Sequence, residues 1–395
     1  MCTILWLSFA AVVVAQEPAV NAPATGFVDK TIAIAGREHR YVVYVPPGYT
    51  RERVWPLIVF LNGMGECGTD GRKHVEVGLG PAIRLDPVRW PFVVVFPQKS
   101  DKQSQWSEHE ALVMGTLAAT EQEFAIDTRR RFLTGLSQGG AGTWALGAKH
   151  AEVWAAIAPV CGYGKPADVA ARLKATPIWA FHGIDDKTVP AQQSKDLCAA
   201  VEKAGGTPVL TLYENTAHNS WDKAYRESSL AEWLRTIVDH PLAARYLAEP
   251  ALLASARIEI IWREVAAGGG ETKPRRVELS ARDRGIDRWV ERADGSGAGE
   301  MGRATHVKSW HDLGNDPRKY IHDPLRQFAR GDLFARLATQ AADDETPGHR
   351  VVVELAGKPG QWRFTTHVPS AEVMAKPARD AVEQVISVVE ADVPR

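Results

Sequence analysis

Residues 130–146 read Arg-Arg-Phe-Leu-Thr-Gly-Leu-Ser-Gln-Gly-Gly-Ala-Gly-Thr-Trp-Ala-Leu, and this stretch decides the fold. An apolar, strand-like run ends at Gly135, a Gly-x-Ser-x-Gly turn carries Ser137, and an amphipathic helix follows. Gly135 and Gly139 suit a sharp strand-to-helix turn, where the backbone is crowded around the serine. The pattern predicts a Ser137 hydroxyl that stands clear of a sheet, near the unpaired amides of a helix N-terminus. The alternative is a serine that only caps the helix.

Candidate partners for this serine follow two later apolar runs. The stretch 179–190 passes from a predicted strand into a turn with Asp185 and Asp186, and the stretch 209–218 passes from another strand to His218. The order serine, acid, histidine along the chain is that of the α/β-hydrolase fold. Catalytic loops of a parallel sheet gather at the C-terminal ends of its strands. We therefore expect these side chains to meet at one edge of a sheet.

The three residue types suit nucleophilic catalysis. A serine hydroxyl becomes an effective nucleophile when an imidazole takes its proton, and a carboxylate orients that imidazole and stabilises its protonated form. We predict Ser137 as the nucleophile, His218 as the general base and acid, and Asp186 as the orienting acid, with Asp185 as its competitor. The alternatives are that His218 is a loop histidine without a catalytic role, and that Asp185 and Asp186 are solvated residues of a turn.

A glycine-rich loop supplies candidates for an oxyanion site. The stretch 56–68 predicts a buried strand that runs into this loop. Backbone amides there, with the amide that follows the nucleophile, can bind the negative oxygen of a tetrahedral intermediate. We nominate the N–H groups of Met64 and Gln138. The alternative is an ordinary glycine-rich turn.

Seven segments, in the same order, resemble the secreted α/β-hydrolase esterases that include feruloyl esterases and polyhydroxybutyrate depolymerase-like enzymes, also labelled phospholipase/carboxylesterase. The resemblance covers about residues 26–240. The seven segments are 61–68, 78–81, 96–98, 135–140, 159–162, 181–186 and 217–221. In the family pattern the acid stands four residues after a histidine at a strand end, which favours Asp186. Asn62 departs from the usual histidine of the oxyanion loop, and Lys99 from the usual small residue, which is expected to alter the rim of the pocket.

Strand and helix patterns alternate through this part of the chain. Strands are predicted at 27–34, 40–46, 56–61, 92–96, 131–135, 154–159, 177–182 and 208–213, and helices at 108–124, 139–149, 191–204 and 227–239. Near-continuous apolar strands between helices predict a mainly parallel sheet flanked by helices, the α/β-hydrolase class. We assign the catalytic domain to residues 26–245.

Beyond about residue 250 the pattern changes. The segments that alternate in strand fashion are 256–262, 276–280 and 351–355. A helical pattern over 371–390 closes the chain, so we predict a smaller C-terminal α+β domain over 251–395. No motif in this domain carries chemistry, and packing or carbohydrate and cell-surface binding are its open roles.

The N-terminus has the pattern of an export signal. Residues 4–14 form an apolar stretch too short to span a bilayer, and small residues precede Gln16. We predict a signal peptide at 1–15, a linker at 16–25, and a secreted or periplasmic protein without a transmembrane anchor. Because the first residues contain no lysine or arginine, an apolar N-terminus without a signal is the alternative.

Charge and cysteine spacing exclude other classes of function. A formal net charge of −1 offers no basic surface for nucleic acid. The sequence has no His-Glu-x-x-His or Cys-x-x-Cys spacing, so neither a metal nor another cofactor is expected. Cys67 and Cys161 fall in loops that the resemblance places near the active site, which leaves a bridge between them open.

The leading hypothesis is a secreted serine esterase that cleaves a small-molecule or polysaccharide-linked ester through an acyl-enzyme. Trp106 and Trp221 lie near the predicted catalytic loops and are candidates for an aromatic or sugar-binding rim. The alternatives are a serine peptidase of the prolyl-oligopeptidase type and a catalytically inert binding protein on the hydrolase fold. The acyl group, the alcohol and the oligomeric state are not predicted.

Overall fold

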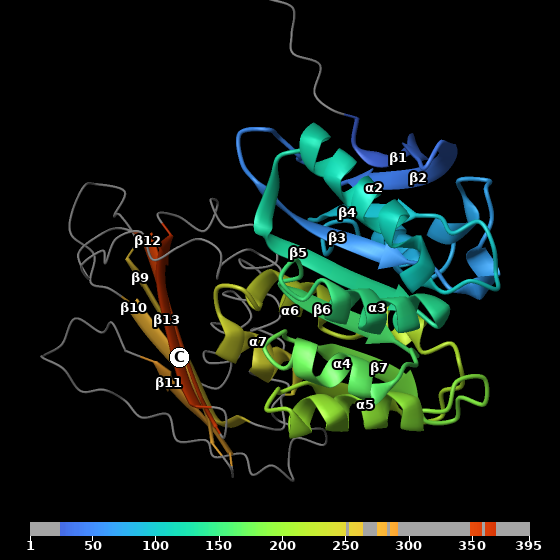
Figure 1. Cartoon of the computed structure of the whole chain (residues 1–395). Helices are drawn as coiled ribbons and strands as arrows, with labels where there is room; N and C mark the ends of the chain where they lie inside the picture. Colours follow the sequence, from blue (N-terminus) through green and yellow to red (C-terminus); the bar gives the residue numbers. More distant parts are fainter. Residues whose placement is uncertain are drawn as a thin grey trace, which may run out of the picture.

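The computed structural model describes residues 24–249 and, beyond them, the strands within 253–263, 275–282, 285–290, 348–357 and 360–368. The signal peptide predicted at 1–15 and the helix predicted at 371–390 lie outside the described residues. The larger sheet has eight strands. Figure 1 shows helices on the faces of this sheet, and a second set of strands from the C-terminal part.

The eight-stranded sheet is mainly parallel. Its strands are β1 (Gly26–Ile34), β2 (Arg37–Val45), β3 (Trp55–Leu61), β4 (Val93–Pro97), β5 (Ile126–Leu136), β6 (Ala156–Val160), β7 (Trp179–Gly183) and β8 (Val209–Tyr213). They lie in the order β1-β2-β4-β3-β5-β6-β7-β8. The strands from β4 to β8 are parallel neighbours, whereas β1 and β2 form an antiparallel hairpin that pairs with β4. The predicted α/β-hydrolase sheet is confirmed.

Strand β5 begins earlier than predicted. It starts at Ile126, which pairs with Trp55, whereas the predicted strand begins at residue 131, just before the apolar run. Residues 127–131 of the strand are polar, and Asp127 accepts hydrogen bonds from the side chain and amide of Arg129. A polar strand start of this kind has no apolar pattern, so no strand was predicted there.

Helices cover both faces of the sheet. They are α1 (Leu79–Leu85), α2 (Glu110–Glu123), α3 (Gln138–Lys149), α4 (Pro166–Leu173), α5 (Gln192–Lys203), α6 (Leu230–Thr236) and α7 (Pro241–Ala248). Residues of α2, α3, α4 and α5 share one buried cluster with Leu57 and Val59 of β3, and residues of α1 and α6 share the other with Ile58 and Phe60. Alternate residues of a strand thus fill the two cores, as the period of two requires.

The helices predicted at 108–124, 139–149 and 191–204 are present as α2, α3 and α5. The one predicted at 227–239 is present as the shorter α6, and a π-helical turn, Lys223–Glu227, precedes it. Helices α1, α4 and α7 were not predicted, because each has eight residues or fewer and offers little periodicity. Pro166 and Pro241 at their first turns were usable start signals for α4 and α7.

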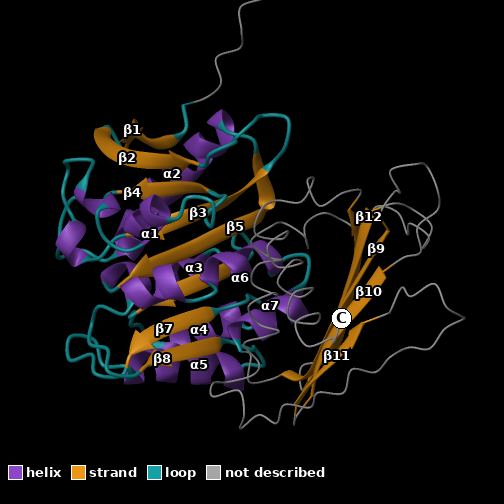
Figure 2. Cartoon of the chain, turned by 180° about the vertical axis from the view of Figure 1, so that it is seen from behind, coloured by secondary structure: helices purple, strands orange, loops and turns teal. Residues whose placement is uncertain are grey.

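The C-terminal strands form a separate antiparallel sheet. Its strands are β9 (Leu253–Arg263), β10 (Arg275–Arg282), β11 (Gly285–Val290), β12 (Gly348–Gly357) and β13 (Gly360–Val368), in the order β11-β10-β9-β12-β13 (Figure 2). The three strands predicted from alternation fall within β9, β10 and β12. Among the residues that the structure describes, no helix has both the length and the apolar character needed to cross a membrane.

Candidate active site

Ser137 lies at a sharp elbow between β5 and α3. Its backbone has φ 55° and ψ −115°, an unusual conformation for a residue other than glycine, and its N–H donates to the Val160 carbonyl at 2.9 Å. A Cβ at Gly139 would stand 1.9 Å from the carbonyl oxygen of Leu61. Glycine is therefore required for α3 to begin against the end of β3, which brings the serine to the glycine-rich loop.

A continuous hydrogen-bonded chain connects the three predicted side chains. His218 Nε2 lies 2.9 Å from Ser137 Oγ, and His218 Nδ1 lies 2.6 Å from Asp186 Oδ2. A carboxylate oxygen only accepts, so Nδ1 donates to it and Nε2 is left to accept the serine proton. Asp186 is buried, whereas Asp185 is exposed and makes no contact with His218 among the described hydrogen bonds.

The strand ends bring the acid and the histidine together. Asp186 follows β7 and His218 follows β8, its neighbour in the sheet. A Cβ at Gly183 would stand 2.2 Å from the Thr216 carbonyl oxygen, and the Asp185 N–H donates to that same carbonyl at 3.0 Å. The two loops are thus packed backbone to backbone, which sets the distance between the two side chains.

The two nominated oxyanion amides begin helical turns. Met64 is the first residue of the 3₁₀ turn Met64–Glu66, and Gln138 is the first residue of α3. The first N–H groups of a helix have no acceptor within it, so both remain available to a ligand. Buried Asn62 supports the loop by donating from Nδ2 to the Gly63 carbonyl at 2.6 Å. Asn62, which departs from the family pattern, therefore stabilises the conformation of this loop.

Comparison with known proteins agrees with this geometry. Residues 83–237, a span that holds Ser137, Asp186 and His218, match the model of the Dienelactone hydrolase family. The match covers less than half of the chain, and over this span the chain is similar to that family. The expected resemblance to α/β-hydrolase esterases is thereby confirmed.

Individual relatives of the hydrolase domain are esterases by name. "Probable feruloyl esterase C" of Aspergillus terreus is 26% identical over 163 residues, which cover 40% of this chain and 57% of that protein. The chain thus spans little more than half the length of this curated relative. A thermostable esterase structure is 32% identical, with a TM-score of 0.49 and coverage of 53% of this chain and 62% of its own. A ferulic acid esterase is 16% identical, with a TM-score of 0.42 and coverage of 50% and 93%.

Trp106 of the hydrolase domain does not lie where the sequence suggested. It is fully buried, and its indole N–H donates to the carbonyl of Asn62 at 2.9 Å. A ring buried against the glycine-rich loop has no face open to a substrate, so the prediction of a binding rim is wrong for Trp106. Trp221 is only half-buried and lies edge-on to His218, with 5.5 Å between the ring centroids.

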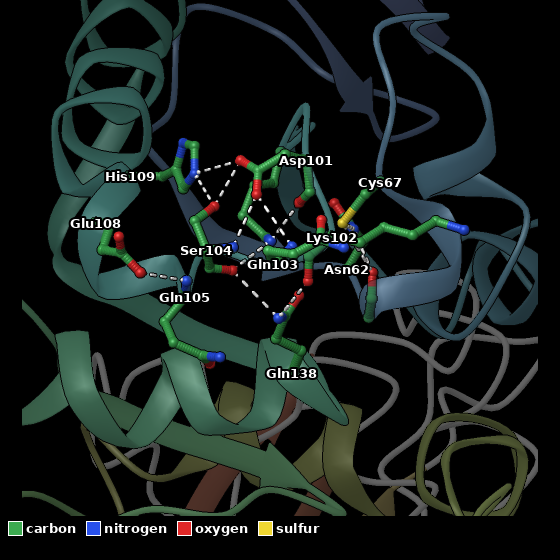
Figure 3. Close-up of polar contacts among 12 residues, drawn as sticks. Asn62, Cys67, Asp101, Lys102, Gln103, Ser104, Gln105, Glu108, His109 and Gln138 are labelled. Atoms are coloured by element: carbon green, nitrogen blue, oxygen red, sulfur yellow. Dashed lines mark hydrogen bonds and ion pairs between the residues drawn. The ribbon is translucent and has the colours of Figure 1, made fainter.

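Lys99 also differs from the expectation of a pocket rim. Its side chain is fully buried, and Nζ donates to the carbonyls of Asp101 at 2.5 Å and Ser104 at 2.6 Å. The side chain of Gln138 donates to the carbonyls of Lys102 and Ser104, at 3.1 Å and 3.2 Å (Figure 3). The two side chains together fix the loop 101–105 against the start of α3.

This loop contains a second cluster of serine, histidine and aspartate. Ser104 Oγ donates to Asp101 Oδ2 at 2.6 Å and lies 2.6 Å from His109 Nε2 (Figure 3). The hydroxyl and the amide of Ser104 hold the pKa of Asp101 well below its usual range. The Ser104 hydroxyl donates its one hydrogen bond to the Asp101 carboxylate. His109 Nε2 is therefore the donor in its contact with Ser104 Oγ and cannot act as a base toward that serine.

The described cysteines of the hydrolase domain are unbridged. Cys67, Cys161 and Cys198 are buried free thiols, so the bridge left open between Cys67 and Cys161 is not formed. Burial raises the pKa of Cys161 and of Cys198 to about 12, which keeps both protonated at neutral pH. Within the described residues, no three His, Cys, Asp or Glu side chains are grouped in a way that could hold a metal ion.

Proposed function

We propose that this protein is a serine esterase that hydrolyses carboxylic esters through an acyl-enzyme. The observation that supports it most is the chain from Ser137 Oγ through His218 to Asp186, with distances of 2.9 and 2.6 Å. Each member follows a parallel strand, and the nucleophile stands on a strained elbow. This arrangement suits acyl transfer, since each imidazole nitrogen faces one partner.

In the proposed reaction, Ser137 Oγ attacks the ester carbonyl carbon while its proton passes to His218 Nε2. The Met64 and Gln138 N–H groups donate to the oxygen that becomes negative, and the Asp186 carboxylate stabilises the imidazolium. As the tetrahedral intermediate collapses, His218 gives its proton to the departing alcohol, and the acyl group stays on Ser137. Water then attacks the acyl-enzyme with His218 again as base, which releases the acid and restores the serine.

The proposed substrate is a small-molecule or polysaccharide-linked ester. Support comes from the name of the relative, feruloyl esterase C, and from the apolar surroundings of the site. Met64 and Ile184, each next to a loop of the site, expose their side chains, and half-buried Trp221 lies against His218. An apolar rim of this kind suits an aromatic or short aliphatic acyl group.

The decisive experiment combines hydrolysis of p-nitrophenyl acetate with labelling by a fluorophosphonate probe. We expect the wild type to turn over and to be labelled, and Ser137→Ala to lose both, with a fall in kcat of roughly 10⁴–10⁶-fold. Ser104→Ala is the matched control, because that serine also contacts a histidine and an aspartate but should keep both activities. Turnover by Ser137→Ala would overturn the proposal.

Two further assays test whether the enzyme prefers esters to amides and whether the protein is exported. Esters of graded acyl length, methyl ferulate and acetylated xylan are compared with aminoacyl anilides, and faster turnover of the anilides would indicate a peptidase instead. We also propose export, with the catalytic domain at 26–245 and a second domain at 251–395. N-terminal sequencing of the mature protein should begin near Gln16, and an intact Met1 would contradict export by cleavage.

A further inference from the structure

His182 is a buried histidine that the proposed mechanism does not use. It lies in β7, four residues before Asp186, and its side chain is fully buried. Its Nε2 lies 2.8 Å from the Val189 carbonyl oxygen and 3.3 Å from Asp186 Oδ2. Its Nδ1 lies 2.7 Å from the hydroxyl of Ser194, a buried residue of α5. Both ring nitrogens are therefore occupied.

The groups that contact the two ring nitrogens determine the protonation state of His182. A carbonyl oxygen only accepts, so Nε2 carries a proton and donates it to Val189, with Asp186 Oδ2 3.3 Å from the same nitrogen. Burial lowers the pKa of His182 below its ordinary value, so the ring is neutral near pH 7. Nδ1 then has a free lone pair and accepts from the Ser194 hydroxyl, so both contacts agree with the tautomer that carries its proton on Nε2.

His182 approaches the same oxygen of Asp186 that contacts His218. Asp186 Oδ2 faces His218 Nδ1 at 2.6 Å and His182 Nε2 at 3.3 Å, while Oδ1 accepts the N–H groups of Thr188 and Val189, each at 2.9 Å. The Asp186 side chain is fully shielded from solvent, and a buried carboxylate is costly without such donors. The same ring also closes the turn after β7 through the Val189 carbonyl.

We propose that His182 is a positioning residue, oriented by Ser194, that holds the Asp186 carboxylate in the geometry that His218 needs. The inference rests on the proposed esterase function, since it assigns no second reaction. His182 cannot replace His218 as the base, because it has no open nitrogen and no contact with Ser137 among the described hydrogen bonds. Its effect passes through Asp186 to His218.

The test compares His182→Phe, which keeps the ring volume but no donor, with His182→Gln, whose amide reaches the position of Nε2. We expect His182→Phe to lower kcat on p-nitrophenyl acetate by roughly 10–100-fold, by analogy with the residues that hydrogen-bond and orient metal ligands, with KM little changed. His182→Gln should recover most of that loss. Ser194→Ala should show a smaller fall, because the Val189 carbonyl still keeps the proton on Nε2 but the ring loses the hydrogen bond that orients it from Nδ1.

A pH profile separates positioning from simple packing. Without the His182 donor, the Asp186 charge is shared less and acts more strongly on the imidazolium of His218. The acidic limb of kcat/KM should therefore move to higher pH in His182→Phe and less in Ser194→Ala. Circular dichroism and thermal unfolding identify the folded variants. If His182→Phe does not fold, His182→Gln and Ser194→Ala carry the same comparison.

Three outcomes would overturn the inference. A folded His182→Phe with the kcat and pH profile of the wild type removes the proposed role. Equal losses in His182→Gln and His182→Phe indicate packing alone, as does Ser194→Ala with an unchanged profile. Failure of the esterase proposal looks different, because the wild type would then neither turn over the ester nor react at Ser137 with a fluorophosphonate.

Discussion

Ser137, His218 and Asp186 form one serine–histidine–aspartate cluster, and Ser104, His109 and Asp101 form another. In the first, the imidazole lies between the other two groups and contacts each through a different nitrogen. In the second, a single nitrogen of His109 faces both partners, at 2.6 Å from Ser104 and 3.4 Å from Asp101.

The surroundings of the two clusters differ as much as their order. The Asp186 side chain is fully buried, whereas that of Asp101 is 46% exposed. Each histidine lies edge-on to a tryptophan, but Trp221 beside His218 is half-buried and Trp106 beside His109 is fully buried. Proximity of the three residue types is therefore not sufficient. The order of donors and acceptors decides whether a serine can lose its proton to an imidazole.

The largest expected difference lies between the two histidines. His218→Gln removes the base that accepts the serine proton, and kcat on p-nitrophenyl acetate should fall by roughly 10⁶-fold. His109→Gln should leave kcat close to the wild-type value, because His109 only donates to a loop hydroxyl. Steady-state kinetics of the two purified variants measure this contrast. A comparable loss in both would mean that the second cluster takes part in the reaction.

The second largest difference in kcat is expected between variants of Asp186 and Asp185. Asp186→Asn keeps the shape of the side chain but no longer favours the proton on Nδ1 of His218, so kcat should fall by about 10⁴-fold. Asp185→Asn is the matched control one residue away, exposed and outside the hydrogen-bonded chain. We expect it to keep full activity in the same assay. The reverse result would assign the catalytic role to Asp185 instead of Asp186.

The tryptophans test which cluster faces a substrate. Trp221→Ala removes an apolar surface beside His218 and should raise KM for an aromatic acyl ester by about tenfold, with less effect on an acetyl ester. Trp106→Phe should instead lower the melting temperature, because it removes the hydrogen bond to the Asn62 carbonyl. Kinetics on both esters and thermal unfolding check the pair. An unchanged KM in Trp221→Ala would exclude that ring from the acyl pocket.

The smallest expected effect concerns the stability that the second cluster provides. The Ser104 hydroxyl and amide lower the pKa of Asp101 in the folded state, so they stabilise the fold where the carboxylate is ionised. Ser104→Ala should cost about 0.5–1 kcal/mol of unfolding free energy at neutral pH, since the site is partly solvated. The deficit should shrink as the pH falls below about 4, where the unfolded carboxyl takes up its proton. Urea titrations of the wild type and Ser104→Ala at several pH values measure this deficit. A deficit that does not change with pH would contradict its origin in the Asp101 carboxylate.

Much of the site was predictable because its signals are local. A Gly-x-Ser-x-Gly turn between a strand and a helix points to Ser137, and strand ends followed by polar turns point to Asp186 and His218. His182 and Ser194 were missed as a pair, because they are twelve positions apart and only the packing of α5 on β7 brings them together. The one usable signal was the position of His182, four residues before the acid.

The sequence by itself determined the order of strands and helices and the residue types at the strand ends, because apolar periodicity and glycine positions act over a few residues. Only the tertiary structure decided that Asp186 rather than Asp185 contacts His218, that Trp106 and Lys99 are buried, and that the Ser104 cluster has its donors in the wrong order for catalysis. These outcomes depend on side-chain direction and burial, which the packing of distant segments sets. The triad is such a case, since its members lie 49 and 32 positions apart along the chain and meet through the register of β5, β7 and β8.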